Sequence, residues 1–173
     1  NPSLVGSEMC IRDSDYILTK AKDSNIAELI NLLILMPDEA NTIYPPYNKQ
    51  IGARYLKGLI DQDLVLLLVK DKKIIGTIGG NITRWWWSES KMLFNTFFFV
   101  KEEHRTYDNA KKLIMGFNQI AKKNLVPLIM GTSDAKDMER KDMLFEKLGF
   151  RKIGGQYGIG AVSYTHLTLP TTD

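Results

Sequence analysis

The chain has 173 residues, a formal net charge of +3 and 44% hydrophobic residues, which is the size and composition of one globular domain. The charge is too small and too widely spread to predict a nucleic-acid-binding protein, and no apolar run reaches the ~18 residues that a membrane span needs. The single cysteine, Cys10, and the two histidines, His104 and His166, make neither a disulfide framework nor a metal site. We therefore expect a cytoplasmic protein with no metal, nucleic acid or membrane among its partners.

The two ends differ from the rest of the chain. Residues 1–14 (NPSLVGSEMCIRDS) have neither helical nor strand periodicity, and residues 161–173 (AVSYTHLTLPTTD) form a threonine-rich tail of low charge. Both strings resemble translated sequencing-adapter read-through that recurs at the ends of unrelated metagenomic proteins, and natural disordered tails are the alternative. We predict one domain over residues 15–160, with Cys10 and His166 outside its site.

Hydrophobic periodicity predicts the elements of the first third of the chain. Residues 16–20 alternate as a short strand, and residues 26–33 have the spacing of a helix, which we expect Pro37 to end. A second short helix follows, with an apolar stripe made of Ile51, Tyr55, Leu59 and Ile60.

A hairpin and a long apolar strand come next. Residues 63–70 and 74–82 are both strand-like and are joined by a polar turn, which is typical of a hairpin. Gly76, Gly79 and Gly80 in the second strand indicate a bulge or a close backbone approach. Residues 92–100 then form a long apolar strand.

The last third predicts two helices and two short strands. Residues 110–121 keep the cleanest helical spacing, 126–130 form a strand, and 138–148 form an amphipathic helix. Gly149 should end that helix in a left-handed conformation, and a last strand is expected over 150–157. Because this order mixes hairpins with helical crossovers, it predicts an α/β (α+β) domain with a mixed sheet.

The turn between the long strand and the best helix has features of an anion site. A helix N-terminus presents unpaired N–H groups and a positive dipole end, where a pyrophosphate fits. Arg105 adds a charge-assisted donor, and Ala110 is small enough for close approach. Asp108 can cap the helix through the Lys111 N–H, but its charge should weaken phosphate binding. A capped helix start without a ligand is the alternative.

The same turn resembles the acyl-CoA-binding motif of GNAT acetyltransferases, in which Arg or Gln, two residues, Gly, one residue and Gly or Ala follow an apolar strand. Arg105 and Ala110 match this motif, and Asp108 stands where the first Gly usually is. The string Glu146–Phe150 (EKLGF) is similar to the end of the family's next helix. The resemblance covers the domain and implies the GNAT fold, a mixed, mostly antiparallel twisted sheet of about six strands flanked by about four helices.

The resemblance also implies a co-substrate and its contacts. Acetyl-CoA would donate the acetyl group, and the acceptor would be a primary amine of a small molecule or peptide. The pantetheine arm would bind to the backbone of one strand, at Phe98, Phe99 and Val100. The amide near Phe99 would be the oxyanion donor. The phosphates would lie on the turn made by Arg105, Thr106, Tyr107, Asp108, Asn109, Ala110 and Lys111.

The proton-transfer groups are less well defined. In the family the leaving-group acid is often a Tyr just before the Glu-Lys-Leu-Gly string, where this chain has Phe145. Either Tyr157 on the last strand takes this role, or the thiolate leaves without a side-chain acid. Asn95 and Thr96, on the long strand, can orient a water but cannot be strong bases. Glu103 is a candidate base, with a solvated surface position as its alternative, and we interpret His104 as a surface residue.

Aromatic residues are the candidates for the acceptor side. Tyr44 and Tyr47 occupy the loop that often forms one wall of the acceptor site in the family. Because strand side chains alternate between faces, the three residues Trp85–Trp87 cannot all enter one core, so at least one should be exposed or in an interface. Trp85 is our candidate for the acceptor cleft, and a homodimer contact is the alternative use of the three rings.

The expected function is therefore acetyl-CoA-dependent N-acetyl transfer. The departures at Asp108 and Phe145 leave two alternatives open. One is a GNAT-fold protein that binds acyl-CoA or a partner without transferring the acyl group. The other is a phage-associated structural or maturation factor that keeps only the fold. This alternative rests on resemblance, since this small, lysine-rich chain with loosely matching motifs is similar to GNAT proteins from phage and metagenomic sources.

Overall fold

The computed structural model describes residues 15–40, 45–132, 136–155 and 157. Two 3-10 turns, η1 (Asp23–Asn25) and η2 (Glu102–His104), lie before α2 and α5. The helices and strands follow in the order β1 (Ile17–Lys20), α2 (Ile26–Leu33), α3 (Leu35–Ala40), α4 (Lys49–Asp61), β2 (Val65–Lys70), β3 (Lys73–Arg84), β4 (Lys91–Val100), α5 (Tyr107–Lys123), β5 (Leu128–Ile129) and α6 (Met138–Lys147).

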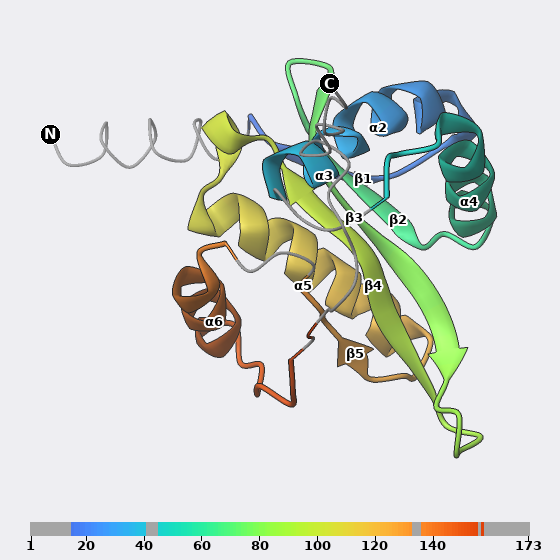
Figure 1. The fold of residues 1–173 in the computed structure, drawn as a ribbon, viewed down its shortest axis with the longest axis vertical. Coiled ribbons are helices and arrows are strands. Elements are labelled where there is room, and N and C mark those ends of the chain that lie inside the picture. Colours follow the sequence, from blue (N-terminus) through green and yellow to red (C-terminus); the bar gives the residue numbers. More distant parts are fainter. Residues whose placement is uncertain (1–14, 41–44, 133–135, 156, 158–173) are drawn as a thin grey trace, which may run out of the picture.

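The five strands form one sheet in the chain order β1-β2-β3-β4-β5. The pairs β1–β2, β2–β3 and β3–β4 are antiparallel, and β4–β5 is parallel. The predicted mixed, mostly antiparallel sheet and the predicted hairpin are thus confirmed. Figure 1 shows β3 and β4 as a long ribbon that extends past the helices to the turn that joins them.

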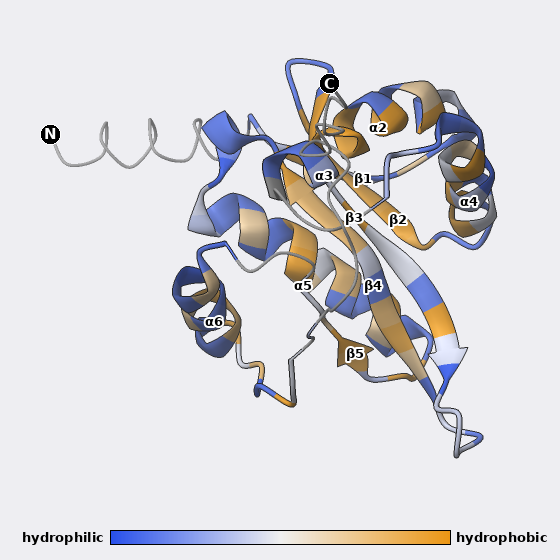
Figure 2. Cartoon of the chain, viewed as in Figure 1, coloured by the Kyte–Doolittle hydropathy of each residue, from blue (hydrophilic) through white to orange (hydrophobic). Residues whose placement is uncertain are grey.

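Helices cover both faces of the sheet. Gly76 on β3 faces α5, because a Cβ there would lie 3.2 Å from a methyl carbon of Leu113. Asn81 lies an odd number of positions further along β3 and so points to the opposite face, where its amide bonds to Tyr55 of α4. Apolar residues of the sheet and of the helices meet between the sheet and the helices on each face (Figure 2). The largest fully buried side chains include Phe117, Leu29, Leu56, Leu67, Ile78 and Leu93.

A β-bulge interrupts the pairing of β3 with β4. Gly79 pairs with Phe97 and Gly80 pairs with Asn95, so Thr96 is the extra residue. A Cβ on Gly80 would lie 2.7 Å from the Cα of Asn95, and the Phe97 ring covers Gly79. Gly80 therefore requires glycine, because the backbone of β4 fills the space of a Cβ, and the shift in register confirms the bulge predicted from these residues. A bulge bends the strand and re-aims the extra side chain, here the side chain of Thr96.

The ends of the helices differ in part from the sequence expectations. The N-cap of α5 is Thr106, whose side chain accepts from Asn109 N, and not Asp108, which is the second residue of the helix. Thr106 has the extended backbone that an N-cap needs. Pro37 does not end the first helix, because α2 has already ended at Leu33. Pro37 lies in the first turn of α3, where its missing N–H is not needed.

The end of α6 follows the prediction. Gly149 has a φ of +90°, and the next N–H, of Phe150, donates to the carbonyl of Phe145 at 2.9 Å. The rings of Phe145 and Phe150 pack edge to face at 5.4 Å between centroids. This is the Schellman arrangement with its hydrophobic contact.

The predicted last strand over 150–157 is wrong for the described residues of that range, which form no strand. The Phe150 side chain is used in the cap of α6, and Lys152 pairs with Asp142 of α6 at 2.7 Å. Gly154 and Gly155 then weaken any strand interior. The segment is therefore tied to α6 rather than to the sheet.

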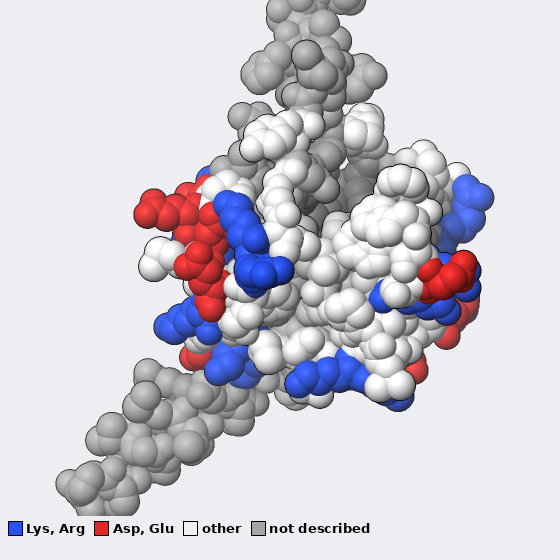
Figure 3. All heavy atoms as spheres, turned by 90° about the horizontal axis from the view of Figure 1, so that it is seen from below, with Lys and Arg blue, Asp and Glu red and all other residues white. Residues whose placement is uncertain are grey.

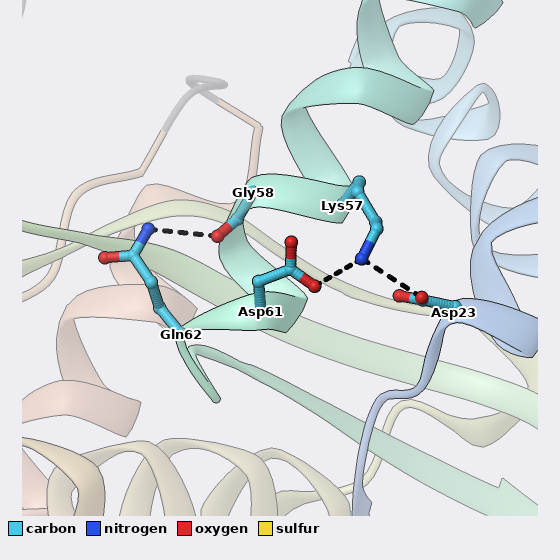
Figure 4. Close-up of polar contacts among 5 residues, drawn as sticks. All are labelled: Asp23, Lys57, Gly58, Asp61 and Gln62. Atoms are coloured by element: carbon cyan, nitrogen blue, oxygen red, sulfur yellow. Dashed lines mark hydrogen bonds and ion pairs between the residues drawn. The ribbon is translucent and has the colours of Figure 1, made fainter.

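Polar contacts join the C-terminal end of α4 to the 3-10 turn η1 (Figure 4). Lys57 pairs with Asp61 at 2.5 Å on its own helix and with Asp23 of η1 at 3.1 Å. These two carboxylates raise the pKa of the Lys57 ammonium. The side chain of Gln62 donates to the carbonyl of Gly58 at 3.0 Å. The helix is thus held at its end by exposed contacts and along its length by buried Leu56 and Leu59.

Candidate functional site

The parallel pair β4–β5 is very short and ends in a side-chain bridge. Its register comprises only Leu93 with Leu128 and Phe94 with Ile129. Directly beyond this, Asn95 Nδ2 donates to Gly131 O at 3.1 Å, and Gly131 N donates to Asn95 Oδ1 at 2.6 Å. A side chain thus takes the place of the strand ladder. From Asn95 to the end of β4, no strand of the described residues pairs with that edge.

Asn95 was predicted as a catalytic residue that orients a water. In the structure it is 6% exposed, and both ends of its amide are bound to Gly131. Its observed role is to hold β4 and the segment after β5 at a fixed separation. A buried amide with both partners satisfied is rigid, so Asn95 marks where the two strands part.

The free edge of β4 leads to the N-terminus of α5. The five strand residues from Thr96 to Val100 are four residue steps and span about 13 Å. In the first turn of α5, Thr106 satisfies the N–H groups of Asn109 through its side chain and of Ala110 through its carbonyl, at 3.2 and 3.1 Å. Of the first-turn donors that a helix leaves unpaired, those of Tyr107 and Asp108 remain for an anion.

Arg105 lies beside this turn, but its guanidinium is already engaged. Its Nε donates to the carbonyl of Val100 at 2.7 Å, its Nη2 pairs with Glu39 of α3, and its Cζ lies 5.3 Å from the centroid of the Phe99 ring. A phosphate would therefore share Arg105 with Glu39. Arg105 as a phosphate ligand stays a prediction, and no sequence pattern indicates Glu39 as its partner.

Two lysines surround the first residue of α5. Lys147 Nζ lies 4.3 Å from the centroid of the Tyr107 ring, and Lys111 Nζ lies 6.0 Å from it. Lys147 belongs to α6 and to the Glu-Lys-Leu-Gly-Phe string. We did not select it from the sequence, because helical spacing alone does not indicate which neighbouring helix end a lysine approaches. The two cations and the helix dipole make this end of α5 favourable for an anion.

Other residues of the predicted turn are structural. Asn109 is 2% exposed, and its amide donates to the carbonyl of His104 at 2.8 Å. His104 is half-buried rather than a surface residue, and its Nδ1 is hydrogen-bonded to Tyr16 at 3.1 Å. Glu103 is exposed on η2 and lines a shallow hollow with Lys70 and Lys73. It lies beyond the C-terminal end of β4, so nothing places its carboxylate beside the bulge.

A cluster of three polar side chains lies on the opposite face, at the bulge. The hydroxyls of Tyr55 and Thr96 are 2.6 Å apart, and Asn81 Nδ2 donates to the Tyr55 oxygen and lies 3.5 Å from Thr96 Oγ1. We call these three residues the hydroxyl cluster. Neither Tyr55 nor Asn81 is indicated as a site residue by the sequence, because the spacing of Tyr55 assigns it to the apolar stripe of α4. In the structure Tyr55 is 37% exposed, and Leu56 is buried instead.

The aromatic candidates for the acceptor side are placed as follows. Tyr44 lies outside the described residues. Tyr47 is half-buried against Gly52 in the first turn of α4, and burial raises the pKa of its phenol. Trp85 is half-buried, whereas Trp86 and Trp87 are 90% and 62% exposed. The three rings contact one another at the turn between β3 and β4, which confirms that they do not all enter the core.

The structure does not place a candidate for the leaving-group acid next to the free edge of β4. Phe145 packs on Phe150 and carries no proton to donate. Tyr157 is fully exposed and lies in no strand. Within the described residues, nothing directs its hydroxyl toward β4.

Charged side chains gather at the margins of one end of the molecule and leave its middle uncharged (Figure 3). The described residues hold no group of three or more His, Cys, Asp or Glu side chains that could bind a metal ion. Among the helices described, none has the length and apolar composition to cross a bilayer.

Solved structures of acetyltransferases share this fold. A probable acetyltransferase superposes with a TM-score of 0.64 at 16% identity over 85% of this chain and 99% of its own. A predicted acetyltransferase from Clostridium acetobutylicum, with acetyl-CoA, gives 0.66 at 14% identity over 83% of this chain and 95% of its own. An aminoglycoside acetyltransferase from an uncultured soil metagenomic sample, in complex with sisomicin, gives 0.61 at 16% identity over 85% of this chain and 97% of its own.

No protein-family model matches the sequence, and no curated protein matches it. A GNAT family acetyltransferase of Staphylococcus aureus is also similar in structure, with a TM-score of 0.58 at 18% identity. At these identities the likeness concerns the fold. The chain has the fold of GNAT acetyltransferases.

Proposed function

We propose that this chain is an acetyl-CoA-dependent N-acetyltransferase that acts on a primary amine of a small molecule or peptide. The observation that carries the proposal is the early end of the β4–β5 pair at the Asn95–Gly131 bridge. Among the described residues it leaves a strand edge without a partner strand, and this edge leads directly to a helix N-terminus. A pantetheine arm is an extended chain with amide groups, so it can bind such an edge in place of a strand.

The cofactor half of the proposed site follows the strand edge. The main chain of Phe98, Phe99 and Val100 would bind the pantetheine arm. The pyrophosphate would accept from the N–H groups of Tyr107 and Asp108, near the ammonium groups of Lys111 and Lys147. The Val100 carbonyl already accepts from Arg105, so the arm would use the main-chain groups before it.

The chemistry proposed is direct attack of the amine on the thioester. The amine must be neutral to attack, and the thioester oxygen needs a donor as charge develops, for which an amide of β4 near Phe99 is the candidate. Phe145 packs on Phe150 and has no proton to donate, so the thiolate would leave without a side-chain acid. A thiolate is a good leaving group, since an alkyl thiol such as that of cysteine has a pKa of about 8.5.

The same packing of Phe145 supports one alternative, a protein that binds acyl-CoA and does not transfer the acyl group. Free-thiol release from acetyl-CoA over a panel of primary amines separates the two. Release that depends on the amine supports the enzyme. Flat traces with every amine, together with acetyl-CoA binding, support the binding protein.

Lys147 offers the sharpest test of the cofactor site. We expect Lys147→Gln to weaken acetyl-CoA binding, because it removes a cation beside the N-terminus of α5. The matched control is Lys123→Gln, which removes the same charge in the last turn of that helix, about 24 Å away by helix rise. The measurement is the melting temperature with and without excess acetyl-CoA.

A ligand at a hundred times its dissociation constant adds about 2.7 kcal/mol to the free energy of unfolding. The wild type and Lys123→Gln should show this shift in full, and Lys147→Gln should show less at equal ligand concentration. No shift for the wild type at millimolar acetyl-CoA contradicts both acyl-CoA functions and favours a structural factor that keeps only the fold. Equal shifts for both variants would mean that the phosphates bind elsewhere.

A further inference from the structure

We propose that the hydroxyl cluster of Tyr55, Asn81 and Thr96 is a proton relay that carries the proton of the attacking amine to solvent. The proposal rests on the acetyl-transfer function above. Three separate elements, α4, β3 and β4, each contribute one of these side chains. Polar groups that meet from three elements on an otherwise packed sheet are placed by the fold and not by local chain geometry.

The position of Thr96 connects the cluster to the cofactor edge. Thr96 is the extra residue of the bulge and directly follows Asn95, whose bridge marks where the edge of β4 becomes free. The Thr96 side chain points to the α4 face, since it bonds to Tyr55. Because α5 covers the other face, an acceptor that approaches from the α4 side meets Thr96 two residues before Phe98, at the end of the arm that would carry the thioester.

The contacts within the cluster suit proton transfer. The O–O distance between Tyr55 and Thr96 is 2.6 Å, and either hydroxyl can donate. The Asn81 amide donates to the Tyr55 oxygen, which fixes the orientation of the phenol. Tyr55 is 37% exposed, so its proton can pass to water. The cluster therefore runs from the bulge to solvent.

The reaction balances as follows. The nitrogen of the neutral amine forms a bond to the acetyl carbon, and the C–S bond breaks to release the CoA thiolate, which takes a proton from water. The nitrogen carries one excess proton after attack. Thr96 Oγ1 accepts that proton as its own moves to the Tyr55 oxygen, and the Tyr55 proton passes to water. Both side chains end neutral, as they began, so no group in the relay needs a stable charge.

Thr96 is thus the catalytic residue that touches the amine, while Tyr55 and Asn81 act through it. Three other polar side chains are less suitable as the group that accepts the proton of the amine. The Asn95 amide is bound at both ends, Glu103 lies beyond the end of β4 on η2, and Tyr157 is fully exposed outside any strand.

The test compares substitutions of equal shape. Thr96→Val removes the hydroxyl and keeps the branched side chain, Thr96→Ser keeps the hydroxyl, and Tyr55→Phe removes only the phenol oxygen. Thiol release is measured with propylamine at high concentration and with sisomicin, at saturating acetyl-CoA. We expect Thr96→Val and Tyr55→Phe to lower kcat about 10²-fold, the scale of a lost proton-transfer group, and Thr96→Ser to keep most of the rate.

Rescue by an added base distinguishes a relay from a structural role. A tertiary amine accepts protons and cannot be stably acetylated. It should restore thiol release by Thr96→Val in proportion to its concentration at constant pH, and leave the wild-type rate unchanged. Melting temperatures with and without acetyl-CoA serve as the check on folding and cofactor binding for each variant.

Each outcome decides the proposal. Rate loss in both hydroxyl-deleted variants, with retention in Thr96→Ser and rescue by the tertiary amine, supports the relay. Wild-type turnover with undiminished rates in the variants overturns the relay and leaves the acetyltransferase function standing. Rate loss without rescue, or equal loss in Thr96→Ser, assigns the cluster a structural role and also overturns it. No turnover by the wild type with these two amines or with any other amine of the panel overturns the relay together with the transferase function.

Discussion

Asn95 joins two segments that the sheet itself does not join, and this single amide sets the geometry of the proposed site. Both of its hydrogen bonds go to the main chain of Gly131, and Gly131 is the partner that would be left without them. The sequence marks Asn95 only as a polar residue in an apolar strand. Its partner lies thirty-six residues away in the chain, so no local pattern could predict the bridge.

We expect Asn95→Ala to lower the free energy of unfolding by about 1–3 kcal/mol, because it removes two hydrogen bonds to the half-buried main chain of Gly131, each worth about 0.5–1.5 kcal/mol. The control is Asn124→Ala, which removes one exposed side-chain bond to the carbonyl of Ile120 and should stay within about 0.5 kcal/mol. Urea unfolding of both variants gives the comparison. Equal stabilities would mean that water replaces the Asn95 amide at no cost.

At the scale of elements, two glycines of α4 allow a test of how this helix packs against the candidate acceptor loop. Nothing surrounds a Cβ at Gly58, whereas a Cβ at Gly52 would lie 2.8 Å from Cζ of the Tyr47 ring. Gly58→Ala should therefore gain about 1 kcal/mol of stability from helix propensity. Gly52→Ala should gain nothing or lose stability, because the ring must move.

Thermal unfolding of the two alanine variants checks this difference. A shift of Tyr47 should also change the KM for the amine if this loop bounds the acceptor site, with kcat little changed. An equal gain at both positions would contradict the contact between Tyr47 and Gly52.

The elements themselves were largely predictable, and the exceptions have physical causes. Periodicity indicated the hairpin, the long strand β4 and the helix α5, because each has one clear apolar face. Periodicity placed Tyr55 on the apolar face of α4, whereas the structure buries Leu56 and leaves Tyr55 partly exposed. A tyrosine can occupy either kind of position, because it has both an apolar ring and a hydroxyl. Periodicity also predicted a strand over 150–157, because alternation of side chains does not reveal that Phe150 packs on Phe145 in the cap of α6.

At the scale of the whole molecule, the core that the structure describes lies within residues 16–150. Its buried apolar cluster runs from Ala21 to Ala121, and the residues packed around it from Tyr16 to Phe150. We therefore propose that a chain of residues 15–160 keeps the melting temperature of the full chain and its response to acetyl-CoA. Loss of either property on trimming would show that residues 1–14 or 161–173 contribute to folding or to the site.

The sequence led to the cofactor half of the proposed site more directly than to the acceptor half. A helix N-terminus with Arg105 and Ala110 is a local pattern and can be seen in one stretch of chain. The hydroxyl cluster and the contact of Lys147 with Tyr107 join distant elements, so only the folded chain brings them together.

The unpaired edge of β4 has a consequence for the protein before it meets any ligand. An open strand edge with apolar neighbours is a template on which another chain can add a strand, which is how many proteins begin to aggregate. Beyond Asn95 the edge carries Phe97, Phe98 and Phe99 in succession. A molecule bound along this edge would therefore also act as a shield, so that the cellular supply of that molecule would govern how long the folded protein stays dispersed.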